Sequence, residues 1–124
     1  MRVSLEWIKD FVDITAPAEE VAHRLTMAGL EIEGMETIDG DTVMEVNVTP
    51  NRPDCLNILG IAREVAAAFG LLLKKPRHCI EGPLEKGDVR VEIDAAELCG
   101  RYAGRLIKDV TVKESPDWMR KRLE

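Results

Sequence analysis

The segment that most constrains the fold of this 124-residue chain is a short run with two prolines, Thr49-Pro50-Asn51-Arg52-Pro53-Asp54. Each proline fixes its own φ angle and lacks a backbone N–H, so a β ladder cannot continue through the run. We call residues 49–54 the proline loop and predict that it forms a rigid corner between a strand and a helix. Such a corner is either purely structural or a preorganised docking point for a partner surface.

Three side chains of the proline loop have expected roles. Asn51 is expected to hold the turn, because asparagine side chains bond to nearby backbone groups. Arg52 is expected to pair with a carboxylate, whose geometry matches its guanidinium group. Asp54 is expected to cap a long helix that runs to Phe69 and ends at Gly70.

Two short helices are predicted before the proline loop. Ser4 is expected to cap the first, whose apolar residues reach Val12 at helical spacing. Pro17, which two glutamates follow closely, is expected to begin the second helix, and Gly29 to end it. Both helices have one apolar side, and we expect them to pack against a small sheet.

The sheet is predicted from alternating residues. Residues 30–33 and 44–48 alternate apolar with polar side chains, which is typical of half-buried strands. Asp39-Gly40-Asp41 between them has turn chemistry, so the two strands are expected to form an antiparallel hairpin. Residues 1–3 are long enough only for an edge strand.

Together these elements predict an α+β fold class with two domains. Residues 1–78 are expected to form a small three-helix domain with an antiparallel hairpin. Residues 79–87 form the predicted linker, because they follow a break in the apolar pattern and are rich in glycine and charge. Residues 88–124 are expected to be the opening strands and helix of a second, incomplete domain.

The predicted second domain begins with alternation of Val89, Val91 and Ile93 with charged residues. One or two further strands are expected in 102–112, and Ser115-Pro116-Asp117 is typical of a helix start. The apolar faces of these strands lack a cover. The isolated chain is therefore expected to form homodimers, or to pack residues 85–124 onto the first domain.

The charge distribution disfavours nucleic acid as the main partner. The first 100 residues hold 10 basic and 19 acidic side chains, whereas nucleic-acid binders usually carry a basic face. A small basic cluster is the exception, and its candidate RNA-contacting residues are Lys74, Lys75 and Arg77. A stand-alone tRNA-binding or RNA-binding domain therefore remains an alternative hypothesis.

The sequence contains no recognisable catalytic motif. Phosphate-binding glycine loops and a nucleophile elbow are both missing. His23 is expected to be an exposed helix residue. Cys55, Cys79 and Cys99 form no CxxC pair, so we expect reduced thiols and neither a disulfide nor a metal site. No catalytic residue is assigned, and the chain is expected not to be an enzyme on its own.

Several segments resemble, in order, one protein family, and together they cover nearly the whole chain. They are residues 3–12, 25–33, 48–56 and 59–64, Glu97-Leu98-Cys99, Arg101-Tyr102 and Ser115-Pro116-Asp117-Trp118. The family is the bacterial phenylalanyl-tRNA synthetase (phenylalanine–tRNA ligase) β subunit, and the resemblance is to its N-terminal region. The proline loop is the most specific of these motifs.

The resemblance implies a structural or assembly role in protein biosynthesis. The implied partners are the synthetase α subunit and the remaining β-subunit domains, with tRNA(Phe) bound by the whole assembly in the cytoplasm. ATP and Mg²⁺ are expected only with the α subunit, and no cofactor is expected in this chain. No apolar run is long enough to cross a membrane, so no membrane partner is expected.

The chain also departs from the family pattern. Residues 34–42 lie where the family usually carries an inserted tRNA-binding domain, and nine residues cannot hold one. The editing region of the family would only be starting at residue 124, so no editing residue is carried over. A free-standing deacylase that hydrolyses mischarged tRNA is the remaining, disfavoured alternative.

Overall fold

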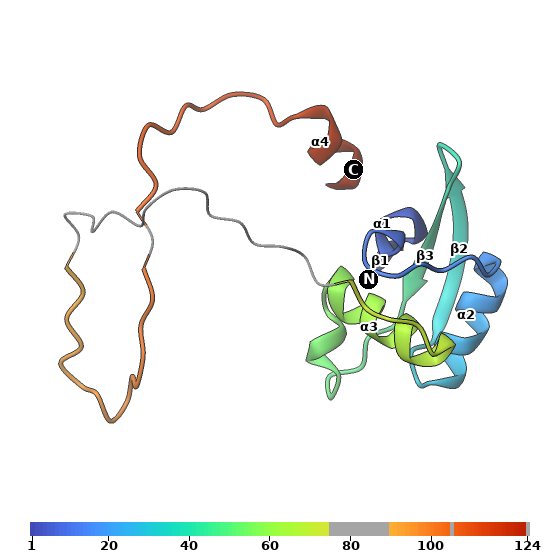
Figure 1. Cartoon of the computed structure of the whole chain (residues 1–124), viewed down its shortest axis with the longest axis horizontal. Coiled ribbons are helices and arrows are strands. Elements are labelled where there is room, and N and C mark those ends of the chain that lie inside the picture. The colour runs from blue at the N-terminus through green and yellow to red at the C-terminus, as the bar shows by residue number, and fades with distance from the viewer. Residues whose placement is uncertain (75–89, 105, 124) are drawn as a thin grey trace. The chain divides into compact units, whose positions relative to one another are not determined.

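The computed structural model describes residues 1–74, 90–104 and 106–123 (Figure 1). The chain divides into two units, Met1–Arg77 with Arg122–Glu124, and His78–Lys121. The predicted linker, residues 79–87, lies outside the described residues. In the part of the chain that is described, no helix combines the length and the apolar character needed to cross a membrane.

The first unit contains a three-stranded antiparallel sheet in the order β1-β3-β2. β2 (Ile32–Ile38) and β3 (Asp41–Val46) form the predicted hairpin, and β1 (Arg2–Ser4) is the predicted edge strand. Asp39 and Gly40 connect the hairpin with φ angles of 50° and 84°. Two positive φ angles match the twist of the flanking strands, which explains the Asp-Gly pair. No further domain lies between β2 and β3.

The first unit has the three predicted helices, of which the first two contact the sheet while the third packs against those two helices (Figure 1). They are α1 (Leu5–Lys9), α2 (Ala18–Met27) and α3 (Ile58–Phe69). Ser4 caps α1 as expected, its Oγ accepting from Trp7 N at 2.9 Å. Gly29 and Gly70 follow α2 and α3 with φ angles of 94° and 64°, which confirms both predicted helix ends.

The first helix is shorter than its apolar pattern suggested. It ends at Lys9, and Val12 instead forms an antiparallel bridge with Leu73, which follows α3. Val12 remains fully buried in this position. The apolar spacing therefore identified which side chain is buried, but a bridge to a distant segment replaced the last helical turn.

The core of the first unit lies between the helices and one face of the sheet. Its largest fully buried side chains come from every layer and are Ile8, Leu25, Leu30, Met44 and Ile61. Burying each such side chain contributes about 1.5–3 kcal/mol. The alternation of β3 is preserved, because Met44 and Val46 are buried while Glu45 between them is exposed.

The second unit has little regular structure in its described residues. A single turn closes between Ala95 and Cys99, and α4 (Asp117–Leu123) begins as predicted after Pro116. The prediction of strands near Val91 and in 102–112 is wrong for the described residues, because they form no β ladder. A strand needs a neighbour for its backbone N–H and C=O groups, and alternation alone does not supply one.

Candidate functional site

The proline loop forms the predicted corner between β3 and α3. Arg52 N donates to Thr49 O at 2.9 Å and closes a first turn. A 3₁₀ turn, η1 (Pro53–Cys55), follows directly, and Leu56 N donates to Pro53 O at 3.2 Å. The chain reverses here in two consecutive tight turns, each of which includes a proline.

Arg52 makes the carboxylate pairing that was predicted for it. Its Nε and Nη2 donate to the two oxygens of Asp54 at 3.1 and 2.9 Å. Nη2 also lies 2.7 Å from Oε1 of Glu64, in the second turn of α3. The guanidinium therefore ties the loop to itself and to the helix after it. No local pattern pointed to Glu64, which is 12 positions away in the sequence.

Asp54 does not cap α3, so that prediction is wrong. The helix begins at Ile58, four residues later, and Asn57 caps it by accepting from Gly60 N at 2.8 Å. The Asp54 carboxylate is already held by Arg52, whose hydrogen bonds lower the pKa of Asp54 to about 2. The same pairing raises the pKa of Arg52 above its ordinary value. The 3₁₀ turn separates Asp54 from the helix start.

Gly60 allows α3 to pack directly on the 3₁₀ turn. A Cβ atom at this position would lie 1.9 Å from the backbone oxygen of Asp54, far closer than atoms can approach. The same oxygen accepts from Nδ2 of Asn57 at 3.1 Å. The corner is therefore rigid because the backbone of Asp54 is held by a cap residue and by close packing.

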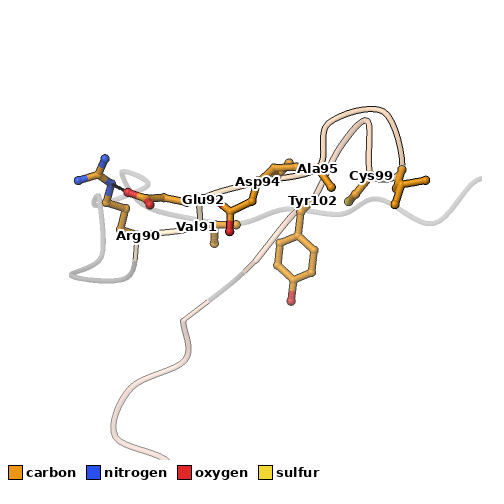
Figure 2. Close-up of a pocket in the computed structure, with 9 residues that line it drawn as sticks. Arg90, Val91, Glu92, Asp94, Ala95, Cys99 and Tyr102 are labelled. Carbon is orange, nitrogen blue, oxygen red and sulfur yellow. Dashed lines mark ion pairs between the residues drawn. The ribbon is translucent and has the colours of Figure 1, made fainter.

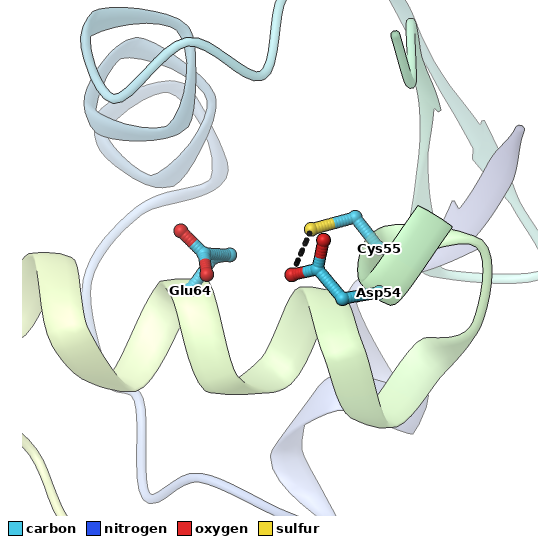
Figure 3. A group of neighbouring side chains, drawn as sticks. All are labelled: Asp54, Cys55 and Glu64. Atoms are coloured by element: carbon cyan, nitrogen blue, oxygen red, sulfur yellow. Dashed lines mark hydrogen bonds between the residues drawn. The ribbon is translucent and has the colours of Figure 1, made fainter. Parts of the chain in front are cut away.

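Asp54, Cys55 and Glu64 form the one group in the described residues with donor atoms close enough to hold a metal ion (Figure 3). Their ligand atoms lie within 4.8 Å of one another. Burial, with help from Asp54, raises the pKa of the Cys55 thiol to about 11, so it is protonated at neutral pH. Because Arg52 already pairs with both carboxylates, the group suits its guanidinium better than it suits a metal ion.

The outer side of the corner is exposed. Thr49, Pro50, Asn51 and Pro53 all face solvent, and Leu56 is 61% exposed. The turn is held by the main chain, and the Asn51 side chain makes no hydrogen bond to a described residue. The expectation that Asn51 holds the turn is therefore wrong.

Of the three candidate RNA-contacting residues, Lys74 is the one that lies among the described residues. Lys74 bonds to Phe11 O through its backbone N at 2.7 Å, and its ammonium group pairs with Asp13. Lys75 and Arg77 lie outside the described residues. His23 is exposed as predicted, and Cys55 and Cys99 are both free thiols. Cys79 is not among the described residues.

A shallow pocket of about 530 Å³ lies in the second unit. Figure 2 shows Val91, Cys99 and Tyr102 among its lining residues. Nε of Arg90 lies 2.6 Å from Oε1 of Glu92. The charged lining residues of the pocket are Arg90, Glu92 and Asp94, and no histidine lies among them to act as a base. The pocket is a place where apolar side chains are exposed, and its charged groups are not arranged for acid–base catalysis.

Searches against known proteins gave relatives of one kind, although no family model matches the chain. A Rhodopirellula baltica protein is 40% identical over 126 residues, covering the whole chain and 18% of the relative. A Desulfotalea psychrophila protein is 47% identical over 92 residues, and a Thermotoga maritima protein 47% over 83 residues. These alignments cover 74% and 67% of the chain, and 11% and 10% of the relatives.

The names of these relatives agree. All three are subunits of an aminoacyl-tRNA ligase, and the chain is related to that class of protein. More particularly, each is named phenylalanine–tRNA ligase beta subunit, and the chain belongs to this family. The resemblance predicted from the motifs is confirmed. The chain spans less than a fifth of the length of these relatives.

Proposed function

We propose that the chain is a structural and assembly module of a phenylalanine–tRNA ligase β subunit. It contributes to aminoacylation of tRNA(Phe) only within a complex with the α subunit and the remaining β-subunit domains. The names of the relatives support this role, because each is a subunit. ATP and Mg²⁺ are then bound by the α subunit, and the chain alone has no activity.

The observation that carries the proposal is the proline loop. Its outer side is exposed, while Arg52 and Gly60 fix its conformation from behind. A surface that is already rigid loses little conformational entropy when it docks, which favours binding. A corner with only a structural role has no need of an exposed leucine at its outer side.

The test is complex formation with the α subunit of the same organism. Chain and α subunit are mixed, and the complex is measured by gel filtration with light scattering. We expect a stable complex that is weakened by Arg52→Ala and unaffected by Arg63→Ala, which replaces an exposed arginine of α3. Failure of the unaltered chain to bind would contradict the proposal, as would aminoacylation by the chain alone.

The isolated chain is also proposed to form homodimers. Apolar side chains of the second unit are highly exposed, with Ile107 and Val112 at 72% and 98%. Burying such residues between two copies is favourable at about 25 cal/mol per Å². Light scattering over a range of concentrations measures this directly, and a strict monomer at high concentration would contradict it.

A further inference from the structure

The β2–β3 hairpin leaves one edge of the sheet without a neighbour among the described residues. The strand order β1-β3-β2 places β2 at this edge, paired with β3 on one side. Helix α2 covers the beginning of the edge, where Thr26 Oγ1 accepts from Ile32 N at 3.2 Å. The rest of β2 is exposed, and Figure 1 shows the hairpin turn extending past α1 and α2. Residues 34–38 therefore offer backbone groups to a further strand.

This open edge belongs to an acidic hairpin. Residues 31–45 include six acidic side chains and neither Lys nor Arg. Of the two glutamates on β2, Glu36 has an ion-pair partner and Glu33 has none in the described residues. Met35 and Ile38 add apolar side chains that are 43% and 41% exposed. Two β2 edges would bring their glutamates together, so the edge fits a strand with basic and apolar side chains better than it fits another β2.

Residues 106–113 of the second unit are a strand-like segment of that composition. Residues 110–113 alternate valine with a polar side chain, and Lys108 and Lys113 supply two positive charges. All eight residues are exposed, and their backbone groups make no hydrogen bond to another described residue. Asp109 bends the segment with a φ of 55°, a conformation found in one class of β-bulge. The segment therefore has the side chains of a strand and needs a neighbour for its backbone.

We propose that two copies of the chain associate by strand addition, with residues 106–113 of each copy pairing with the open β2 edge of the other. This inference rests on the proposed homodimerisation and names the two surfaces that form it. Main-chain hydrogen bonds supply the pairing, and lysines facing glutamates supply its specificity. Because one chain carries both halves of the contact, a two-fold symmetric dimer contains it twice.

The first experiment measures the dimer dissociation constant by sedimentation equilibrium. Glu33→Lys and Lys113→Glu are each expected to raise this Kd about tenfold, because each change places like charges together twice in the dimer. The chain that carries both changes is expected to recover most of the lost affinity, since opposite charges then face each other again. Glu19→Lys is the matched control for Glu33→Lys, because it makes the same charge change at an exposed position of α2.

The second experiment tests whether the contact joins two copies. Equal amounts of unlabelled and ¹⁵N-labelled chain are mixed and treated with a carbodiimide, which links lysine amines to nearby carboxylates. We expect mass spectrometry to find links between the peptides of Lys108 or Lys113 and those of Glu33 or Glu36. Half of these links should join one labelled and one unlabelled peptide.

The outcomes separate this inference from the homodimerisation on which it rests. A dimer whose Kd is unchanged by Glu33→Lys and by Lys113→Glu would overturn the inference and leave homodimerisation standing. Links found only between peptides of the same label would mean that the segment contacts its own chain, and would also overturn it. A strict monomer at high concentration would contradict homodimerisation itself and the inference with it.

Discussion

Residues 44–48 and residues 90–94 both alternate apolar with polar side chains, but only the first run contributes to a sheet. In the first segment, β3 lies between β1 and β2, and Met44 and Val46 are fully buried. In the second, Val91 and Ile93 are 48% and 40% exposed and no ladder forms in the described residues. The comparison shows that alternation encodes a strand only where neighbouring strands and a covering layer are available.

The largest expected effect is on stability, and two matched truncations to alanine compare a buried residue of the first unit with an exposed residue of the second. Leu25→Ala, in the fully buried core of the first unit, should lower the free energy of unfolding by about 2–5 kcal/mol. Ile107→Ala removes a side chain that is 72% exposed and should change it by less than about 0.5 kcal/mol. Urea unfolding of both variants provides the measurement. Similar losses would mean that the second unit has a core of its own.

The two cysteines among the described residues, Cys55 and Cys99, extend the comparison to chemical reactivity. Cys55 is fully buried, and burial raises its pKa to about 11, while Cys99 is exposed. Because the thiolate is the reactive form, alkylation of Cys55 at pH 8 should be at least about 100-fold slower than that of Cys99. Peptide mass spectrometry after timed iodoacetamide treatment measures both rates. In urea the two rates should converge, and equal rates without urea would contradict the burial of Cys55.

Two glycines provide the next test. Gly60→Ala places a Cβ against the backbone of Asp54, and the required shift should cost about 1–3 kcal/mol of unfolding free energy. Gly100→Ala meets no atom within 4 Å and should have little effect. Thermal unfolding by circular dichroism compares the two. An unaltered midpoint for Gly60→Ala would mean that the corner is looser than the packing at Gly60 indicates.

The parts of the fold that were predicted correctly depend on local chemistry. Asp39 and Gly40 adopt the positive φ angles that the hairpin turn requires, and Gly70 does the same after α3. Ser4 bonds to a backbone N–H only three residues away. Such features are set by a few consecutive residues, so a single sequence is enough to identify them.

The candidate site was predicted only in part, because its remaining contacts join distant residues. The corner and the pairing of Arg52 followed from residue types, but the choice of Glu64 depends on how α3 packs against the 3₁₀ turn. Asp54 and Asn57 are both good cap residues, and the turn between them decides in favour of Asn57. The role of Gly60 depends on a close approach that only the folded chain reveals.

The smallest expected effect concerns the charge of the corner and its dependence on pH. Hydrogen bonds from Arg52 hold the pKa of Asp54 at about 2 in the folded chain, below its ordinary value of 3.8. A carboxyl group whose pKa is lowered by folding stabilises the folded state above its unfolded pKa. This contribution is lost as the pH falls through the folded pKa. The contribution of Asp54 should therefore be complete above about pH 4 and absent below about pH 2.

Asp54→Asn removes this contribution while keeping the size of the side chain. The difference in unfolding free energy between the unaltered chain and the variant should be constant from pH 7 to pH 5. It should shrink between pH 4 and pH 2, as measured by urea unfolding at each pH. Asp117→Asn is the control, because it breaks an exposed arginine pair in α4 and should change little at any pH. The difference in unfolding free energy for Asp54→Asn could instead stay constant down to pH 2. That result would show that the pairing with Arg52 does not stabilise the corner. The rigidity of the corner would then depend on Gly60 and the prolines alone.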